Sequence, residues 1–344
     1  MQRLAAEYVL PVRWADRPAE EVDELGRYLR ELAGTVDVTV VDGSAAADFA
    51  RHAAAWSAPG LRHLPPDPWP GRNGKVRGVV TGVRRARHEH VVIADDDVRY
   101  RPQQLAEVVA LLERADLVRP QNVFAPQPWH ARWDTARSLL NRAFGEDWPG
   151  TFGVRRSTFC AMGGYDGDVL FENLQMVRTV RASGGRCTTA WGTYVQRRPP
   201  QARHFLGQRV RQAYDDFAQP GRLLLEASWL PAALLALTRG RRGAVLVAAG
   251  LAASVVVAER GRRRAGGAAH YPASAALWAP AWVCERAVCV WLAVAARARG
   301  GVRYAGSRQP HAVRDPGARR EPLTPAVLSP AAGPGSSGRP ATAG

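Results

Sequence analysis

One short stretch limits the fold of this chain more than any other: an apolar segment that runs into three aspartates, VVIADDDVRY at residues 91–100. Residues 89–94 are predicted to form a strand, which the aspartates would end. A second β-rich run, VDVTVV at residues 36–41, also ends in an acidic turn, Asp42-Gly43-Ser44. In open α/β sheets, ligands bind beyond the carboxyl ends of the strands. Both acidic turns are therefore expected at the binding edge of a sheet.

The segments before these strands also favour an α/β layer fold for residues 1–221. Residues 8–12 are predicted to form a further strand, and residues 20–33 an amphipathic helix. Four apolar side chains recur in that helix at helical spacing, namely Val22, Leu25, Leu29 and Leu32. Short strands that alternate with such helices are typical of a mostly parallel sheet flanked by helices.

The charges of the three aspartates repel one another unless a cation lies between them. Asp95 and Asp97, two residues apart in a tight turn, could both reach one divalent metal ion. Mg²⁺ prefers one or two carboxylates together with substrate phosphates, so a ligand with a diphosphate would complete the site. The alternative is an acidic turn that caps a helix beginning near Pro102, where aspartate is favoured in any case.

The charge of the chain is unevenly distributed. Its 344 residues include 47 Lys and Arg against 31 Asp and Glu, a net charge of +16 that would suit a nucleic-acid-binding protein. After residue 221, however, 17 basic residues stand against 5 acidic ones and alternate with apolar runs. Before it no basic patch is interleaved with aromatic residues, so we predict no nucleic-acid partner. Four dispersed cysteines without zinc spacing, and an N-terminus without the apolar stretch of a signal peptide, predict that the first two-thirds stays in the cytosol.

Three apolar runs follow at residues 223–238, 243–258 and 273–296, each flanked by arginines. A membrane span needs about 20 apolar residues, so two runs are short, and positive residues on every side define no single topology. We expect residues 222–300 to be membrane-associated helices, which places the protein at the cell membrane with its first domain on the cytoplasmic face. Buried core helices of a soluble domain are the alternative. Residues 301–344, rich in Pro, Gly, Ala and Ser, are predicted to form a disordered tail.

Successive motifs within residues 5–215 occur in the order found in the family 2 glycosyltransferases, and the chain resembles that family. The motifs are YVLPV, VVDGS (40–44), GRNGKVRGVVTGV (71–83), IADDDV (93–98), GGYDGDVLFEN (163–173) and QRVRQ (208–212). The resemblance implies a GT-A fold. It also implies a nucleotide-diphosphate sugar as donor, a UDP- or GDP-sugar, and a divalent metal ion, Mg²⁺ or Mn²⁺, as cofactor.

On the donor side, the resemblance places Asp42 near the nucleotide base or ribose, with an ordinary Asp-Gly turn as the alternative. Lys75 is the only lysine beside 46 arginines and follows a glycine. It is either a compact cation that approaches the nucleotide or the start of a surface helix. Asp95 and Asp96 are expected to contact the donor, and Asp97 together with Asp95 to bind the metal ion.

The resemblance places the acceptor and the donor sugar at Gly163, Gly164 and Tyr165. Glycines let the backbone approach a ligand closely; the alternative is a loop turn with Tyr165 packed inside.

The general base of the family comes from an acidic pair, which reads Glu172-Asn173 in this chain. An amide cannot accept a proton at neutral pH, so Glu172 is the expected catalytic base, with Asp166 or Asp168 as the fallback. Alternatively, Glu172 interacts favourably with the dipole of a helix over residues 173–182.

A helix over residues 204–216 carries Gln208 and Arg211, which the resemblance assigns to the donor diphosphate. Arginine binds phosphate oxygens in a bidentate manner. Family members that synthesise long chains usually have Trp after this Arg, whereas Gln212 stands here, which argues against a processive polymerase. A basic amphipathic helix on anionic lipid is the alternative.

The sequence thus predicts a metal-dependent, inverting and non-processive glycosyltransferase with a lipid-linked, polysaccharide or other cell-envelope acceptor. A catalytically impaired membrane scaffold that binds nucleotide sugar without turnover is the alternative. Nucleotidyl transfer would require a glycine-rich basic loop after the first strand, where the chain has the acidic segment RWADRPAEE.

Overall fold

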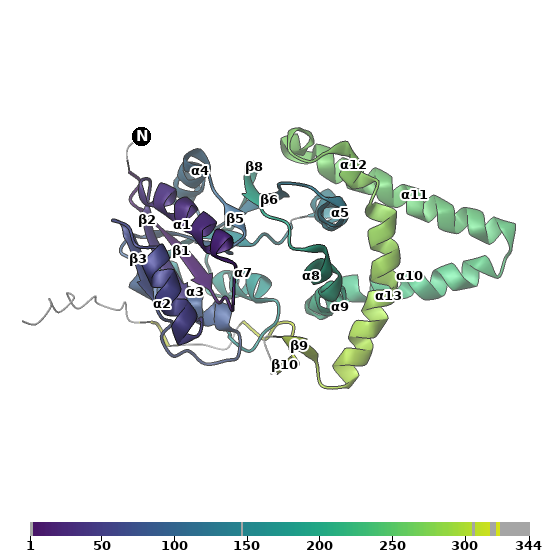
Figure 1. Cartoon of the computed structure of the whole chain (residues 1–344). Helices are drawn as coiled ribbons and strands as arrows, with labels where there is room; N and C mark the ends of the chain where they lie inside the picture. The colour runs from purple at the N-terminus through teal and green to yellow at the C-terminus, as the bar shows by residue number, and fades with distance from the viewer. Residues whose placement is uncertain (1–2, 146, 305–306, 317–320, 324–344) are drawn as a thin grey trace, which may run out of the picture.

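The computed structural model describes residues 3–145, 147–304, 307–316 and 321–323, and within them eight strands form one sheet in the order β3-β2-β1-β4-β7-β6-β8-β5 (Figure 1). The strands are β1 (Ala6–Val12), β2 (Asp37–Asp42), β3 (Leu61–Leu64), β4 (His90–Ala94), β5 (Val98–Arg99), β6 (Leu117–Phe124), β7 (Thr151–Arg155) and β8 (Cys187–Arg197). Strands β3, β2, β1 and β4 run parallel, and so do β6 and β8, whereas β7 and β5 run antiparallel to their neighbours.

Helices cover both faces of the sheet, because successive residues of a strand point to opposite sides. In β1, Tyr8 and Leu10 face one core, which α1 and α4 complete, while Val9 faces a second core with α3, α6 and α7. The helices of this domain are α1 (Ala19–Ala33), α2 (Ala46–Ala55), α3 (Gly74–Arg85), α4 (Pro102–Leu112), α5 (Trp129–Phe144), α6 (Arg156–Ala161), α7 (Glu172–Ala182), α8 (Ala202–Gly207), α9 (Arg209–Tyr214) and the 3₁₀ turn η1 (Asp215–Ala218). The predicted α/β layer fold is confirmed.

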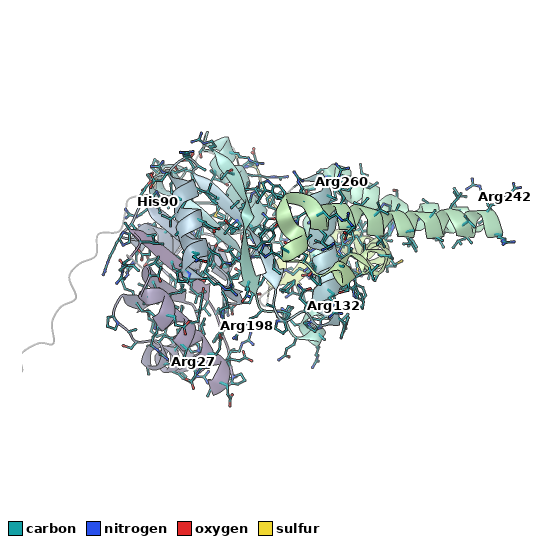
Figure 2. The ribbon with its side chains drawn as sticks, turned by 90° about the horizontal axis from the view of Figure 1, so that it is seen from above. Arg27, His90, Arg132, Arg198, Arg242 and Arg260 are labelled. Atoms are coloured by element: carbon teal, nitrogen blue, oxygen red, sulfur yellow. The ribbon has the colours of Figure 1, made fainter. Side chains whose placement is uncertain are left out.

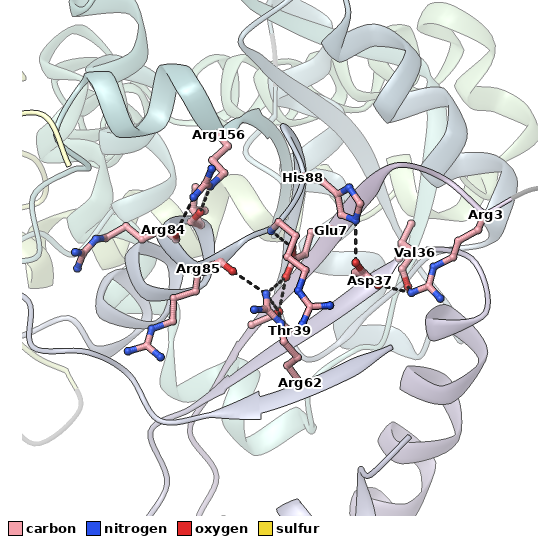
Figure 3. Close-up of polar contacts among 12 residues, drawn as sticks. Arg3, Glu7, Val36, Asp37, Thr39, Arg62, Arg84, Arg85, His88 and Arg156 are labelled. Atoms are coloured by element: carbon pink, nitrogen blue, oxygen red, sulfur yellow. Dashed lines mark hydrogen bonds and ion pairs between the residues drawn. The ribbon is translucent and has the colours of Figure 1, made fainter. Parts of the chain in front are cut away.

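A buried polar cluster ties the outer strands together at the end of the sheet where β1 begins. Glu7 is fully buried, and the hydroxyl of Thr39 donates to its carboxylate. Arg62 of β3 pairs with the same carboxylate and donates to the Arg85 carbonyl at 2.8 Å (Figure 3). These charges lie where β1 begins. They therefore leave the carboxyl ends of the parallel strands free for a functional site.

One local expectation was wrong, and one alternative is excluded. Residues 204–216 do not form one helix, because the chain breaks at Gln208 between α8 and α9. The aspartates after β4 do not cap a helix either: α4 begins at Pro102 with Arg101 as its N-cap residue, and β5 separates it from the acidic turn. The turn is therefore not required for a helix end.

All three apolar runs form helices: α10 (Pro220–Leu237), α11 (Arg241–Arg263), and α12 (Ala273–Ala276) followed by α13 (Ala279–Ala298); the 3₁₀ turn η2 (Arg264–Ala269) follows α11. Helices α10 and α11 form a hairpin that projects from the sheet domain, and α13 crosses its base (Figure 1). Figure 2 shows Arg242 at the outer end of this projection and Arg260 near its base. In the described part of the chain, two helical segments are long and apolar enough to cross a membrane, residues 241–269 and 273–298.

The few charges of the apolar runs lie at the base of this helical region and are paired. Arg286 of α13 contacts Asp216 of η1 at 2.8 Å, and Glu226 of α10 contacts Arg222 at 2.8 Å. Large apolar side chains of the hairpin are instead exposed, among them Leu224, Leu234, Val245, Leu246 and Val256. A contiguous apolar surface of this kind marks a membrane or protein contact.

The chain does not become irregular at residue 301 as expected. Strands β9 (Val302–Tyr304) and β10 (Ser307–Gln309) pair as a hairpin. The carbonyls of His311 and Ala312 then accept hydrogen bonds from the backbone of residues 170 and 171. Backbone pairing of this kind does not depend on apolar periodicity, which is why the composition gave no sign of it. The predicted tail at residues 324–344 lies outside the described residues.

We predict that Gly82→Ala destabilises the domain. A Cβ at Gly82 would lie 2.2 Å from Cγ1 of Val9, between α3 and β1, whereas a Cβ at Gly74 meets nothing within 4 Å. Overpacking costs about 1–3 kcal/mol, so the unfolding free energy in urea should fall by that amount. Gly74→Ala, the matched control in the same helix, should leave it unchanged or raise it slightly. Equal effects of the two variants would contradict this packing.

Candidate active site

Lys75 connects the two carboxylates on which the candidate site is centred. It follows the first residue of α3, where the side chain of Asn73 caps the helix by accepting from the Lys75 backbone N–H at 3.0 Å. Its Nζ lies 2.6 Å from Oδ1 of Asp95, just after β4, and 2.7 Å from Oε1 of Glu172, the first residue of α7. Burial lowers the pKa of Lys75, but the two carboxylates outweigh burial and hold its pKa well above the usual range.

Arg197 of β8 is the second cation at the acidic turn. Its Nε donates to Oδ2 of Asp97 at 2.7 Å, and its Nη2 lies 3.4 Å from Oδ2 of Asp95. The antiparallel pairing of β5 with β8 brings Arg197 opposite Val98. No sequence motif marks this arginine, since only the strand pairing brings it to the turn.

Asp97 retains one oxygen for a ligand. Its Oδ1 is buried and has no hydrogen-bond partner among the described residues. Burial raises the pKa of Asp97 to about 6; Arg197 opposes the rise and the charges of Asp95 and Asp96 add to it. A divalent cation would satisfy this oxygen, and two carboxylates suit Mg²⁺ when phosphates supply further oxygens. The described residues contain no cluster of three or more His, Cys, Asp or Glu that could hold a metal ion without a substrate.

A polar cavity of about 180 Å³ adjoins these groups. Its lining includes four of the predicted site residues, Asp95, Glu172, Gln208 and Arg211. It also includes Arg197 and Asp215, which the sequence analysis missed. Burial raises the pKa of Asp215 to about 7, with Arg211 opposing the rise and Glu172 contributing to it.

Asn173, the departure from the expected acidic pair, has a structural role. Its Nδ2 donates to the Pro149 carbonyl at 3.1 Å, and its Oδ1 accepts from Lys75 at 3.4 Å. It therefore helps to position Lys75 beside Glu172.

Asp96 and Asp42 have protein partners. The indole of Trp14 donates to Asp96, and the Trp14 backbone N–H donates to the Ser44 hydroxyl at 2.9 Å. Asp42 is buried at the end of β2, where its Oδ2 lies 2.8 Å from Nδ1 of His52 and 3.0 Å from Nε2 of His63. A strand-end cavity of about 240 Å³, lined by Val12, Arg13, Val41, Gly43, Pro66, Arg72, Gly74, Arg77 and Gly78, lies at this edge of the sheet.

The segment Gly163–Asp168 lies apart from the lining of the polar cavity. Gly163 and Gly164 have positive φ angles of 71° and 67°, which side chains rarely adopt. Tyr165 is buried against Phe159 in the core, with ring centroids 6.0 Å apart. Asp166 accepts from the backbone N–H of Asp168 at 2.7 Å.

A residue of the segment after α13 approaches both of these aspartates. Arg314 lies 3.8 Å from Asp166 and 3.7 Å from Asp168, so the chain after α13 contacts the segment predicted to bind the acceptor.

The sheet order, the acidic turn after its central strand and the adjoining cavity of carboxylates and arginines define the class of GT-A glycosyltransferases. Residues 33–214 match the model of the family described as "Glycosyltransferase like family 2". The chain belongs to this family and is a glycosyltransferase.

Three solved structures, each with a bound nucleotide sugar, are similar to this chain. The mannosyltransferase PcManGT from Pyrobaculum calidifontis, in complex with GDP-Man and Mn²⁺, is 18% identical over 84% of this chain and 88% of that one, with a TM-score of 0.47. Glucosyl-3-phosphoglycerate synthase from Mycobacterium tuberculosis, with Mn²⁺ and UDP-glucose, is 17% identical over 59% and 73%, with a TM-score of 0.39. S. aureus TarS, with UDP-GlcNAc, is 12% identical over 58% and 60%, with a TM-score of 0.40. Among curated proteins, none matches this chain.

We predict that Asp42 makes the unfolding free energy of the protein depend on pH in the acidic range. Burial raises its pKa, but hydrogen bonds from His63, Ser44 and His52 lower it to about 2, from an ordinary value of 3.8. The carboxylate then contributes about 2 kcal/mol to the unfolding free energy above pH 4, and this contribution is lost as the pH falls through 2.

Asp42→Asn should therefore lower the unfolding free energy at pH 7 by about that amount, and the gap to the wild type should narrow towards pH 3. Urea unfolding of both proteins from pH 3 to pH 7 measures this difference in unfolding free energy. Asp48→Asn, which removes only an exposed pair with Arg51, should cost less than about 1 kcal/mol. A gap that stays constant with pH would contradict the role of Asp42.

Proposed function

We propose that the protein transfers a sugar from a nucleotide-diphosphate donor to a membrane-associated acceptor, with Glu172 as the general base. The observation that carries this proposal is the contact of Lys75 with both Asp95 and Glu172 beside a cavity lined by arginines. The contact joins the donor side of the site to the proposed base. Charges held in a fixed arrangement around a reacting centre are the main source of catalysis in many enzymes.

The donor nucleotide is proposed to bind at the strand-end cavity, where Gly43 and Gly74 leave space and Arg72 and Arg77 supply positive charge. Asp42, which is buried beneath this edge, would support it by fixing His52 and His63. The donor diphosphate then extends towards Asp95 and Asp97. Gln208 and Arg211, across the polar cavity, are proposed to bind its oxygens.

Asp95 and Asp97 are proposed to hold Mg²⁺ or Mn²⁺. The buried and unsatisfied Oδ1 of Asp97 fits this role, and so does the all-oxygen donor set. When bound, such an ion stabilises the negative charge of the departing diphosphate. Arg197 orients both carboxylates, and Asp96 fixes the turn through Trp14.

Glu172 is proposed to take the proton from the acceptor hydroxyl while the oxygen of that hydroxyl attacks the anomeric carbon of the donor sugar. The bond to the diphosphate breaks on the opposite face, which inverts the configuration. Lys75 holds Glu172 in place through their contact of 2.7 Å. Asp166 and Asp168, the fallback bases, are held by backbone groups and Arg314 away from the polar cavity. With Gln212 in place of Trp, transfer is proposed to be non-processive.

The exposed apolar hairpin of α10 and α11 is proposed to insert into the cell membrane from the cytoplasmic side. Burial of its leucines and valines in hydrocarbon would gain about 25 cal/mol for each Å² removed from water. The arginines that flank the helices suit anionic headgroups. This arrangement would keep the active site beside a lipid-linked acceptor.

We predict that Glu172→Gln lowers kcat by about 10²- to 10⁴-fold, the usual contribution of a general base, and leaves donor binding intact. Asp168→Asn is the matched control and should retain activity. Transfer from a labelled nucleotide sugar measures both. If Asp168→Asn abolishes transfer and Glu172→Gln does not, the base is misassigned. If the wild type binds donor without transfer or hydrolysis, the scaffold alternative holds.

We predict that nucleotide sugar raises the melting temperature of the protein only when Mn²⁺ or Mg²⁺ is present. A thermal-shift screen over UDP- and GDP-sugars, with and without chelator, measures this effect and identifies the donor. Asp97→Asn should abolish the metal-dependent shift, whereas Asp23→Asn, at an exposed position of α1, should preserve it. A shift of equal size with chelator would exclude the proposed metal site.

A further inference from the structure

An apolar cavity of about 850 Å³ lies in the helical region, between α5, α10, α11 and α13. Its walls include Leu140 of α5, Leu225 and Trp229 of α10, Leu251 and Val257 of α11, and Trp282 of α13. The wall residues of α11 (246, 247, 250, 251, 253, 254 and 257) recur at intervals of about one helical turn and so lie on one side of that helix.

Two close contacts lie near this cavity. At the tip of the hairpin, α11 touches α10 so closely that a Cβ on Gly243 would overlap the Ala236 carbonyl. At the base, α11 touches α5, where a Cβ on Gly261 would overlap the Leu139 carbonyl. Between these points some of the lining residues are small, among them Ala232, Ala233 and Gly250. The two close contacts thus bracket the cavity along α11.

The apolar cavity lies next to the polar cavity of the candidate active site. Asn141, Trp148, Gln219 and Arg222 line both. Arg222 donates to the Asn141 side chain at 2.8 Å and pairs with Glu226, so the boundary carries polar groups that already have partners. A molecule that fits both cavities needs a polar head and a long hydrocarbon chain.

We propose that the apolar cavity binds the hydrocarbon chain of the acceptor, a lipid whose head carries the acceptor oxygen as a hydroxyl or phosphate group. The inference rests on the proposed function and deepens it. The chain would lie among the small residues of α10 and α11, and the head would pass Arg222 towards Glu172. The wall residues Leu225 and Leu246 are exposed apolar side chains, and hydrocarbon from an adjoining bilayer is the chemistry that would cover them.

Gly250→Phe tests the proposal with Val256→Phe as its matched control. Gly250 lines the cavity and a Cβ there meets nothing within 4 Å, so this position leaves room for a side chain, whereas Val256 on the same helix is 71% exposed and lies outside the lining. The full chain is placed in phosphatidylcholine nanodiscs, and the binding of tetradecyl phosphate, tetradecanol and butyl phosphate is measured by calorimetry.

The wild type and Val256→Phe should bind the tetradecyl compounds at least tenfold more tightly than butyl phosphate, and Gly250→Phe should lose this difference. Tighter binding of the phosphate than of the alcohol would identify a lipid phosphate, and the reverse a lipid alcohol. Unchanged affinity in Gly250→Phe, or no chain-length preference in the wild type despite the excess phosphatidylcholine, would overturn the proposal.

Donor binding separates this inference from the proposed function. The thermal shift with nucleotide sugar and Mn²⁺ should be the same in both phenylalanine variants and the wild type. If the wild type binds tetradecyl phosphate as expected but shows no donor shift, the lipid site stands and the proposed transfer fails. If the donor shift is present and the chain-length preference is absent, only the lipid site fails.

Discussion

The contact of Lys75 with Asp95 and Glu172 is the constraint on which the site depends. Each of the three groups would be costly to bury alone, and each is stabilised only while the other two remain in place. The contact needs the start of α3, the end of β4 and the start of α7 to converge, and Asn173 and the Asn73 cap hold Lys75 at that point. A lysine ammonium is a compact point charge, and the single Nζ of Lys75 contacts both carboxylates in a chain that otherwise uses arginine.

A second set of charges joins the helical region to the sheet domain. Arg286 pairs with Asp216, and Arg222 contacts both Asp216 and Glu226, so α13 and α10 are both tied to the turn that follows α9. Helix α9 carries Arg211 into the polar cavity. The charges that interrupt the apolar runs are thus part of the contact that fixes the position of a proposed diphosphate-binding residue. A movement of α10 or α13 relative to the sheet domain would therefore also move Asp216 and the adjoining helix α9.

Much of the fold followed from local sequence pattern, whereas the details of the site depended on contacts between distant residues. The strands before Asp42 and Asp95 were placed to within about a residue or two, because alternating apolar residues and acidic turns are local signals. The polar cavity includes Asp95, Glu172, Gln208 and Arg211, whose roles remain predictions. Arg197 could not be found in this way, since only the pairing of β5 with β8 brings it to Asp97. The contact of Arg314 with Asp166 likewise joins residues 148 positions apart, beyond the reach of any local pattern.

The net charge of +16 and the two cavities have one physical explanation. If the hairpin inserts into a membrane as proposed, the arginines that flank the apolar helices would lie at its boundary with water and anionic headgroups. The apolar cavity lies next to the polar cavity, and four residues line both. Under the proposed function, a reaction at this boundary would join a water-soluble donor to an acceptor that stays in the hydrocarbon phase. The proposed lipid acceptor thus gives the helical region a role in the reaction, because its apolar cavity would extend the site from the sheet domain into an apolar space.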